Sequence, residues 1–398
     1  MGGTLAMLRP MRPAPLMARL AVVGLALGAL AGCTKSDAGR ASGPTIAVSV
    51  SRCGTGWEHP AAGPQHFVMS NTDSRAGEAQ LADAATGAIY ADVEPLGPGT
   101  RTTLDVDLGA GRYQFRCAMD DEPMVMGPTV TIGGTAKGTT PAVLPITQAQ
   151  LIPATKRYER YVSGQLPGLA RAVSGLQASI DAGDRGEAEA RWLPAHLAYE
   201  RLGAAYDAFG DYDAQINGTA DGLPRGVHDP SWAGFHRLEY GLWHGASMSS
   251  LRKPAHTLAS SVDALGHFFA TQQIDPLQIG LRSHEITENA VQFELTGTTD
   301  YGSHSNLATV DANLAGTRTT LGIVHPLLAP RDPQTPAIDA ALAQARSDLA
   351  ALRGPDGTWP ALEALTRPQR ERVDADLSSL AELLSSVATV LEPRRGPS

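Results

Sequence analysis

Hydrophobic and polar residues alternate along the first third of the chain with a period of two. Ile46 and Val48 alternate with small residues, and similar alternation returns over 104–108 and 113–117, with stretches rich in Gly and Pro in between. Because successive side chains of a strand point to opposite faces of a sheet, this pattern is typical of short strands with one buried face. We predict a small β-sandwich over residues 45–133.

The pattern changes after a predicted linker over 134–146. From there, apolar residues recur every three or four positions, which is the period of an amphipathic helix. Breaks such as Gly354-Pro355-Asp356-Gly357 contain typical helix terminators. The predicted helices span 148–180, 184–209, 231–244, 255–273, 277–296, 304–326, 335–353 and 367–392. Their number and short connections predict an all-α helical bundle over 147–395. The predicted fold class is therefore multidomain, a β-sandwich followed by an all-α bundle.

The N-terminus has a pattern of its own. Three arginines, Arg9, Arg12 and Arg19, accompany a short apolar run over 20–30. A run this short cannot cross a bilayer as a helix, so it predicts a secretory signal over residues 1–32. No later segment of the sequence approaches the length of a membrane span.

This predicted signal ends in Leu30-Ala31-Gly32-Cys33, which resembles a bacterial lipobox. In that interpretation Cys33 is lipidated and becomes the mature N-terminus, and the alternative is ordinary cleavage that leaves a free thiol. One acyl chain is a marginal anchor, but bacterial lipoproteins carry several. Residues 33–44 are small and polar, which predicts a flexible tether. We therefore expect an extracytoplasmic (periplasmic-side) protein that is lipid-anchored to the cell membrane through Cys33.

The charge balance narrows the classes of partner. The full sequence has a net charge of −9, and the predicted signal contains three arginines and no acid, so the exported chain is more acidic still. Nucleic-acid binding requires a basic face toward the phosphates, so nucleic acid is not an expected partner. An acidic chain is compatible with cation binding.

Two cysteines, Cys53 and Cys117, lie in the predicted β domain. In an oxidising compartment the first interpretation is a structural disulfide. The alternative is a cupredoxin-like copper site in which Cys117 is joined by Met119, Met124, Met126, His59 or His66, because soft sulfur and imidazole ligands suit copper. The segment AMDDEPMVM after Cys117 contains no histidine, which disfavours a blue-copper electron carrier.

The stretch GFHRLEYGLW over 234–243 places His236 and Glu239 three residues apart in an apolar, aromatic run. On a helix these two side chains share a face. Burying a carboxylate costs several kcal/mol unless a cation or a metal compensates its charge. A His and a Glu at this spacing can converge on one ion, although most H-x-x-E sequences are salt bridges or solvated faces.

Other predicted helices also carry acids. Glu200 lies in a largely apolar stretch, and Asp213 follows at the end of that helix. Glu285 and Glu288 are three apart on a later helix. The alternative for Glu285 is a surface pair with Arg282, and Glu200 could pair internally with an arginine. Acids from several helices around one histidine favour a cation such as iron, manganese or zinc.

Several of these motifs together resemble the imelysin family, especially the EfeO-type components of bacterial iron uptake. The resemblance covers roughly 147–393, and it rests on H-R-L-E-Y-G-L-W, the block from Gln292 to Gly302 and the later Asn-Leu-Ala-Gly-Thr-Arg. Residues 45–133 resemble the cupredoxin-like domain that precedes the imelysin domain in many such proteins. The order of the two domains behind an export signal agrees with this resemblance.

The resemblance implies a bundle of two four-helix halves with the H-x-x-E pair, here His236 and Glu239, in a metal-binding cleft. Glu200 resembles the acidic helix position of the family. Family members often have further acids near 203 and 217, where this chain has Gly203 and Asn217. Two other acids are candidates to replace them, Asp213 and Glu288.

As a function, the resemblance implies a component that binds iron, as Fe²⁺ or Fe³⁺, beside an iron permease and a haem-containing peroxidase-like partner. It also implies copper or ferric iron in the β domain, and zinc or manganese remain alternatives for the helical site. A second hypothesis is an imelysin-type metallopeptidase, but neither H-E-x-x-H nor H-x-x-E-H is present, since Tyr240 follows Glu239. A third is a polysaccharide- or partner-binding lipoprotein, which predicts a cleft lined with aromatics rather than acids.

Overall fold

The computed structural model describes residues 43–394, and its N-terminal part is a β-sandwich of two sheets. One sheet has the order β1-β2-β5 and the other β4-β3-β6-β7. The strands are β1 (Thr45–Val48), β2 (Gly63–Asn71), β3 (Gly77–Asp83), β4 (Ile89–Leu96), β5 (Arg101–Leu108), β6 (Gly111–Met119) and β7 (Val125–Ile132). The β-sandwich prediction is confirmed.

An aromatic cluster fills the space between the two sheets. Phe67 of β2 and Phe115 of β6 lie edge to face with ring centroids 5.4 Å apart, and Trp57 packs on Phe67 at 5.0 Å. Along β5, Leu104, Val106 and Leu108 point into this core, while the residues between them are more exposed. The period of two in the sequence therefore corresponds to one buried face of each sheet.

The remainder of the described chain is helical. The α-helices are α1 (Gln148–Ala182), α2 (Arg185–Glu200), α3 (Tyr206–Phe209), α4 (Asp211–Asn217), α5 (Phe235–Trp243), α6 (Met248–Phe269), α7 (Gln278–Asn289), α8 (Asn306–Leu328), α9 (Thr335–Ala350) and α10 (Arg367–Val390). The short helices are η1 (Gly203–Ala205), η2 (Gly226–His228), the π-helical turn η3 (Ala290–Glu294) and η4 (Leu362–Ala364).

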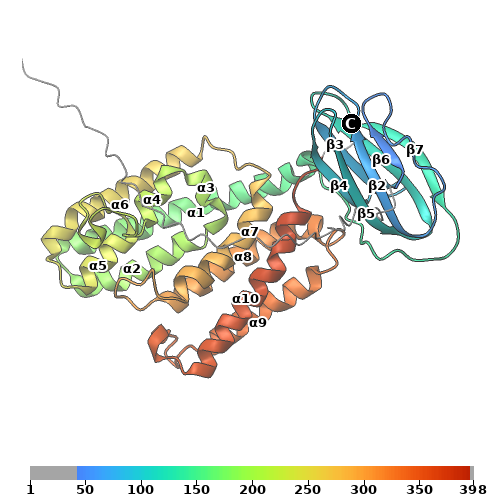
Figure 1. Ribbon diagram of the computed structural model, residues 1–398. Coiled ribbons are helices and arrows are strands. Elements are labelled where there is room, and N and C mark those ends of the chain that lie inside the picture. The colour runs from blue at the N-terminus through green and yellow to red at the C-terminus, as the bar shows by residue number, and fades with distance from the viewer. Residues whose placement is uncertain (1–42, 395–398) are drawn as a thin grey trace, which may run out of the picture. The chain divides into compact units, whose positions relative to one another are not determined.

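Two groups of helices make up this domain (Figure 1). In the first, the long helix α1 packs against α2 and α6, and α5 packs against both α2 and α6. In the second, α7 to α10 pack on one another, with α10 between α7 and α9. Helix α8 also contacts α1 and α2, so it joins the two groups around one continuous apolar core. The all-α prediction is confirmed.

Local signals in the sequence determine where the long helices begin and end. The Thr147 side chain accepts a hydrogen bond from the backbone N–H of Gln150, and the Gln150 side chain accepts one from Thr147 N–H, which is a capping box at the start of α1. Gly183 ends α1 with φ 80°, a conformation that glycine adopts without strain. Asp184 then caps α2 through the backbone N–H of Glu187.

Some predicted bounds were wrong. The predicted helix over 184–209 ends at Glu200, and η1 and α3 follow it after a break. The sequence analysis missed α4, which has only seven residues. Helix α6 begins at Met248, seven residues before the predicted start, because Ser247 caps it and Pro254 is tolerated inside it. The breaks matter for the candidate site, because they bring η1, just after the end of α2, against α7 and α8.

No helix among residues 43–394 has the length and apolar character needed to cross a membrane. The predicted signal over 1–32, the lipidation candidate Cys33 and most of the predicted tether lie outside the described residues.

Candidate metal centre

The helix that carries the H-x-x-E pair begins later than predicted. The prediction placed its start at 231 after Asp229-Pro230, but the Asp229 carboxylate instead accepts hydrogen bonds from the backbone N–H and the hydroxyl of Ser231. Helix α5 starts at Phe235, behind Gly234. Gly234 has φ 90°, and a Cβ there would lie 2.4 Å from the carbonyl oxygen of Ile216. Only glycine fits this close approach.

Within α5, His236 and Glu239 are both buried, with exposed fractions of 3% and 1%. The Nδ1 atom of His236 lies 3.2 Å from Glu239 Oε2. The other oxygen of Glu239, Oε1, accepts three hydrogen bonds from the loop after η3. The donors are the backbone N–H of Tyr301 (3.0 Å), the backbone N–H of Ser303 (3.1 Å) and the Ser303 hydroxyl (2.6 Å).

These contacts give the two residues of the pair different roles. Both carboxylate oxygens of Glu239 are occupied by protein groups, so this residue orients His236. The contact at Nδ1 leaves Nε2 of His236 as the ring nitrogen suited to a ligand. His236 lines a cavity of about 160 Å³, and Glu239 does not. This arrangement resembles the carboxylate–histidine pairs that support metal sites.

A second His–Glu pair lies beside the first, and the sequence analysis missed its histidine. His196 and Glu200 are four residues apart on α2, with His196 Nε2 3.1 Å from Glu200 Oε1. The rings of His196 and His236 are in edge contact, with centroids 5.2 Å apart. The H-x-x-x-E spacing in HLAYE was the available signal, because residues four apart share a helix face.

Glu200 is held mainly by neutral amides. Asn217 Nδ2 donates to its Oε1 at 2.7 Å, and Asn313 Nδ2 donates to its Oε2 at 2.7 Å. Burial acts to raise the pKa of Glu200, but the hydrogen bond and charge of His196, together with Asn313, lower it to about 2. Glu200 is therefore a carboxylate at neutral pH, and Asn217, at a position where the family often has an acid, supports it.

Gly203 also lines the cavity, but it contributes no donor side chain. A Cβ at this position would lie 2.9 Å from the side chain of Ile286 on α7. Ile286 therefore occupies the space beside Gly203, and an acid at residue 203 would require Ile286 to move.

The structure brings a further acid, Glu294, to the cavity, and the sequence analysis did not single it out. Glu294 lies in the π-helical turn η3 and is partly buried. Its carboxylate accepts hydrogen bonds from the Thr299 hydroxyl (2.6 Å) and from Asn306 Nδ2 (3.0 Å). Burial, followed by the negative charge of Glu200, raises the pKa of Glu294 to about 7. The cavity-lining face of α7 and η3 repeats every three or four residues: Arg282, Glu285, Ile286, Asn289, Ala290, Phe293 and Glu294. That repeat was the available signal for Glu294.

Two predicted ligands do not line this cavity. Asp213 accepts a hydrogen bond from the Tyr199 hydroxyl at 2.5 Å. Glu288 is partly exposed, and its carboxylate lies 3.7 Å from His284 Nδ1 and 3.1 Å from Gln292 Nε2. Both therefore remain predictions without support from the cavity geometry.

Glu285 does line the cavity, at the rim. It pairs with Arg282, which is the alternative that the sequence analysis gave for this residue. Arg282 also lies 3.1 Å from Asp207. The acids at the rim are therefore paired with an arginine, whereas Glu200 and Glu294 in the interior have no Lys or Arg partner among the described residues.

The interior donors suit a cation. Glu200 and Glu294 contribute carboxylate oxygens and His236 contributes an imidazole nitrogen, and none of these three pairs with a Lys or Arg in the part of the chain that the structure describes. The three donor atoms do not all lie within 4.8 Å of one another, so one ion held by all three would require side chains to move. We call Glu200, His236 and Glu294 the inner set.

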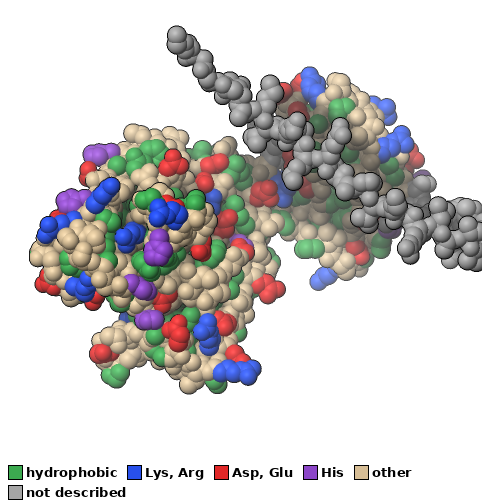
Figure 2. Space-filling model, turned by 60° about the vertical axis from the view of Figure 1, so that its left-hand side comes forward, with side chains coloured by type: hydrophobic (Ala, Val, Ile, Leu, Met, Phe, Trp, Pro, Cys, Tyr) green, Lys and Arg blue, Asp and Glu red, His purple; other side chains and the backbone are tan. Residues whose placement is uncertain are grey.

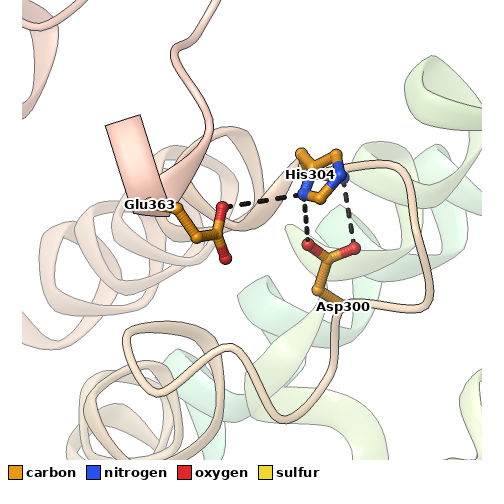
Figure 3. A group of neighbouring side chains, drawn as sticks. All are labelled: Asp300, His304 and Glu363. Carbon is orange, nitrogen blue, oxygen red and sulfur yellow. Dashed lines mark hydrogen bonds and ion pairs between the residues drawn. The ribbon is translucent and has the colours of Figure 1, made fainter. Parts of the chain in front are cut away.

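A second group of donors includes two residues of the loop that holds Glu239 (Figure 3). His304 Nδ1 is 3.1 Å from Asp300 Oδ2 and 3.7 Å from Glu363 Oε2. The donor atoms of this group lie within 4.8 Å of one another. The side chains of His304 and Glu363 are 58% and 67% exposed. We call Asp300, His304 and Glu363 the surface set.

In the β domain, the structure joins Cys53 and Cys117 in a disulfide, with Cα atoms 5.7 Å apart. A disulfide sulfur provides no thiolate for copper. Two of the histidine and methionine candidates lie in other surroundings: His66 pairs with Asp105 at 2.6 Å, and Met126 is exposed. Between residues 43 and 394, two clusters of three potential ligands occur, the surface set and a group of Glu78, Asp92 and Glu94, and neither includes Cys117.

Comparisons with known proteins identify the family of the chain. The family described as Peptidase_M75: Imelysin matches residues 154–387. The protein named Iron uptake system component EfeO from Escherichia coli O1:K1 / APEC is 25% identical over 331 residues, which cover 83% of this chain and 86% of that protein. Proteins of the same name from Escherichia coli strain K12 and Shigella flexneri show the same identity and coverage.

Proposed function

The chain belongs to the imelysin family, and from this premise we propose that it is a metal-binding component of a bacterial iron uptake system. The curated relatives named as iron uptake components match most of its length, which supports this proposal. The cargo is iron, Fe²⁺ or Fe³⁺, bound in the helical domain by Glu200, Glu294 and His236. Glu239 positions His236 through Nδ1. The protein binds and transfers the ion without a turnover of its own.

One observation carries the proposal: the carboxylates of the inner set lie around a small cavity without a Lys or Arg partner among the described residues. A carboxylate removed from water costs several kcal/mol unless a cation compensates its charge. The amides around Glu200 add no positive charge, and among the described residues His196 is its ion-pair partner, whereas Glu294 has only the Thr299 hydroxyl and the Asn306 amide. A divalent or trivalent ion supplies the missing charge, and oxygen-rich sites with one imidazole suit iron, manganese or zinc.

Titration calorimetry of the purified protein with Fe²⁺ under anaerobic conditions, and with Mn²⁺ and Zn²⁺, tests this site. We expect Glu294→Gln to weaken binding on the order of a hundred-fold, because the substitution removes a ligand charge but keeps the shape. The matched control is Glu288→Gln, which removes a partly exposed acid that lies just before the same helical turn but does not line the cavity, and it should leave the affinity unchanged. Equal affinities for wild type and Glu294→Gln would contradict the proposal.

The geometry supports the two alternatives less well. A zinc peptidase needs three protein ligands, an open position and a general base. Glu239, the carboxylate closest to His236, is occupied by the loop amides and does not reach the cavity. A polysaccharide-binding cleft would present aromatics, whereas this cavity presents carboxylates.

The setting of the protein is part of the proposal. The lipobox-like sequence before Cys33 supports an extracytoplasmic protein anchored in the cell membrane by lipid. An iron permease and a haem peroxidase-like protein are the proposed partners, on the strength of the family resemblance. Mass spectrometry of the mature N-terminus tests the anchor: acylated Cys33 is expected, and an unmodified N-terminus at another residue would refute it.

A further inference from the structure

One side of helix α5 does not line the candidate metal centre. Arg237, Tyr240, Gly241 and His244 follow one another at spacings of three, one and three, so they share one side of the helix. They line a second cavity of about 560 Å³, whose other walls are residues 227–233, Ala246 and the first half of α6. The linings of the two cavities have no residue in common.

The second cavity is positively charged. Arg237 and Lys253 both line it, and neither side chain forms an ion pair or hydrogen bond with another residue between 43 and 394. Asp229 is the single acid in the lining, and its carboxylate is occupied by the Ser231 backbone N–H and hydroxyl and by the Arg225 backbone N–H. Lys, Arg and His side chains lie close together on the end of the helical domain that faces the viewer in Figure 2.

Arg237 is held in place within this cavity. The residue is half-buried, and its guanidinium carbon lies 6.0 Å from the centroid of the Trp232 ring. One guanidinium nitrogen lies 3.1 Å from the position that a Cβ of residue 241 would take, so Gly241 makes room for it. A guanidinium that is partly removed from water and has no acidic partner is a ready site for an anion, and its planar fork matches a carboxylate.

Aromatic rings form the wall beside this cation. Tyr240 stacks on His244 with centroids 4.3 Å apart and an interplanar angle of 23°. The Trp232 ring lies 5.9 Å from Tyr240. Such surfaces favour a planar, apolar body over a small hydrated ion. The volume of the cavity lies in the range of sites for small organic molecules.

We propose that this cavity binds a small organic acid with a planar body, its carboxylate on Arg237 and its body against Tyr240 and Trp232. Lys253 supplies a second positive charge for a further oxygen of the ligand. The proposal is independent of the metal centre, because His236 and the inner set line the other cavity.

Benzoate is a suitable probe, with benzamide as its neutral counterpart and acetate as the carboxylate without a ring. By titration calorimetry of the full chain, we expect benzoate to bind in the millimolar range or tighter, and benzamide and acetate to bind at least about ten-fold more weakly. Benzamide binding as tightly as benzoate would overturn the proposal, and so would the absence of benzoate binding at concentrations up to about 10 mM.

Variants then locate the ligand. Arg237→Gln should weaken benzoate on the order of ten-fold, whereas Tyr240→Leu should weaken benzoate but leave acetate unchanged. The matched control is Arg252→Gln, next to Lys253 on α6, because Arg252 donates to the Asp181 carbonyl and does not line the cavity.

Equal losses in Arg237→Gln and Arg252→Gln would contradict the assignment, and so would loss of benzoate binding in His236→Ala. Thermal unfolding followed by circular dichroism shows whether each variant is folded. If Arg237→Gln does not fold, the comparison of benzoate with benzamide on the wild-type protein decides whether the cavity recognises a carboxylate.

Discussion

The helical domain contains two sets of metal-type donors with the same chemistry, two carboxylates and one imidazole. The inner set consists of Glu200, His236 and Glu294. The surface set consists of Asp300, His304 and Glu363 (Figure 3). The donor atoms of the surface set lie closer together, within 4.8 Å of one another, whereas those of the inner set do not.

We infer from this difference that the removal of donors from water is a stronger indication of a metal site than their proximity. His304 and Glu363 are more than half exposed, so water solvates their charges at little cost. Glu200 is 7% exposed and His236 is 3% exposed, and only amides and another histidine compensate Glu200. An ion therefore gains more at the inner set, even though that set must adjust to hold it.

The largest expected effect is the difference in iron affinity between His236→Ala and His304→Ala, each of which removes one imidazole. His236→Ala should weaken iron binding on the order of a hundred-fold or more, about 3 kcal/mol, because it removes a ligand and the partner of Glu239. His304→Ala should change the affinity by less than about three-fold. Calorimetric titration of both variants measures the difference, and a larger loss in His304→Ala would reverse the comparison.

A smaller effect is expected in the pH dependence of metal-free stability. The pKa of Glu294 is raised to about 7 in the folded state, so the folded protein holds a proton that the unfolded chain releases near the ordinary value of 4.5. The stability that this group contributes is full below 4.5 and is lost as the pH rises through 7. The loss should amount to about 1–2 kcal/mol, since the carboxylate is only partly buried.

Glu294→Gln mimics the protonated form, so it should remove this loss between pH 4.5 and 7. Glu363→Gln, in the surface set, should keep the wild-type pH dependence. Urea unfolding of the metal-free proteins at pH 5 and pH 8 measures both. If Glu294→Gln kept the wild-type pH dependence, that dependence would not come from Glu294, and the pKa of Glu294 in the wild type would be an ordinary one.

The smallest effect concerns the loop that donates hydrogen bonds to Glu239. Ser303→Ala removes the hydroxyl that donates to Glu239 but keeps the backbone N–H groups of Tyr301 and Ser303 on the same oxygen. We expect a loss of about 1 kcal/mol, or roughly five-fold in metal affinity. The control is Ser305→Ala, whose hydroxyl lies 2.8 Å from that of Ser303. A hundred-fold loss in Ser303→Ala would instead indicate that Ser303 binds the ion directly.

The architecture was predictable because it rests on local periodicity. Local periodicity indicates which side chains are buried, and burial defines the elements. Examples are the alternation at Leu104, Val106 and Leu108 and the helical repeats through the second part of the chain. The start of α5 was predicted wrongly, at 231 instead of Phe235, because the helical period does not reveal that Asp229 closes a turn with Ser231. Short helices such as α4 carry too few residues for a period to be visible.

The metal centre was predictable only in part. His236 and Glu239 were found through their spacing, and Glu200 through its apolar surroundings. Their division of roles was not predictable, because the amides that occupy Glu239 come from residues more than sixty positions away. For the same reason, spacing suggested Asp213 and Glu288 but could not show that they lie outside the cavity.

The sequence by itself determined the order of the two domains, the helix that carries the H-x-x-E pair and the family to which the chain belongs. These properties depend on neighbouring residues or on a short motif. The tertiary structure alone decided that Glu294 joins Glu200, that His196 stands beside His236 and that Arg237 has no acidic partner within the described range 43–394. Each of these depends on which helices pack together, and packing sets both the distance between charges and their access to water.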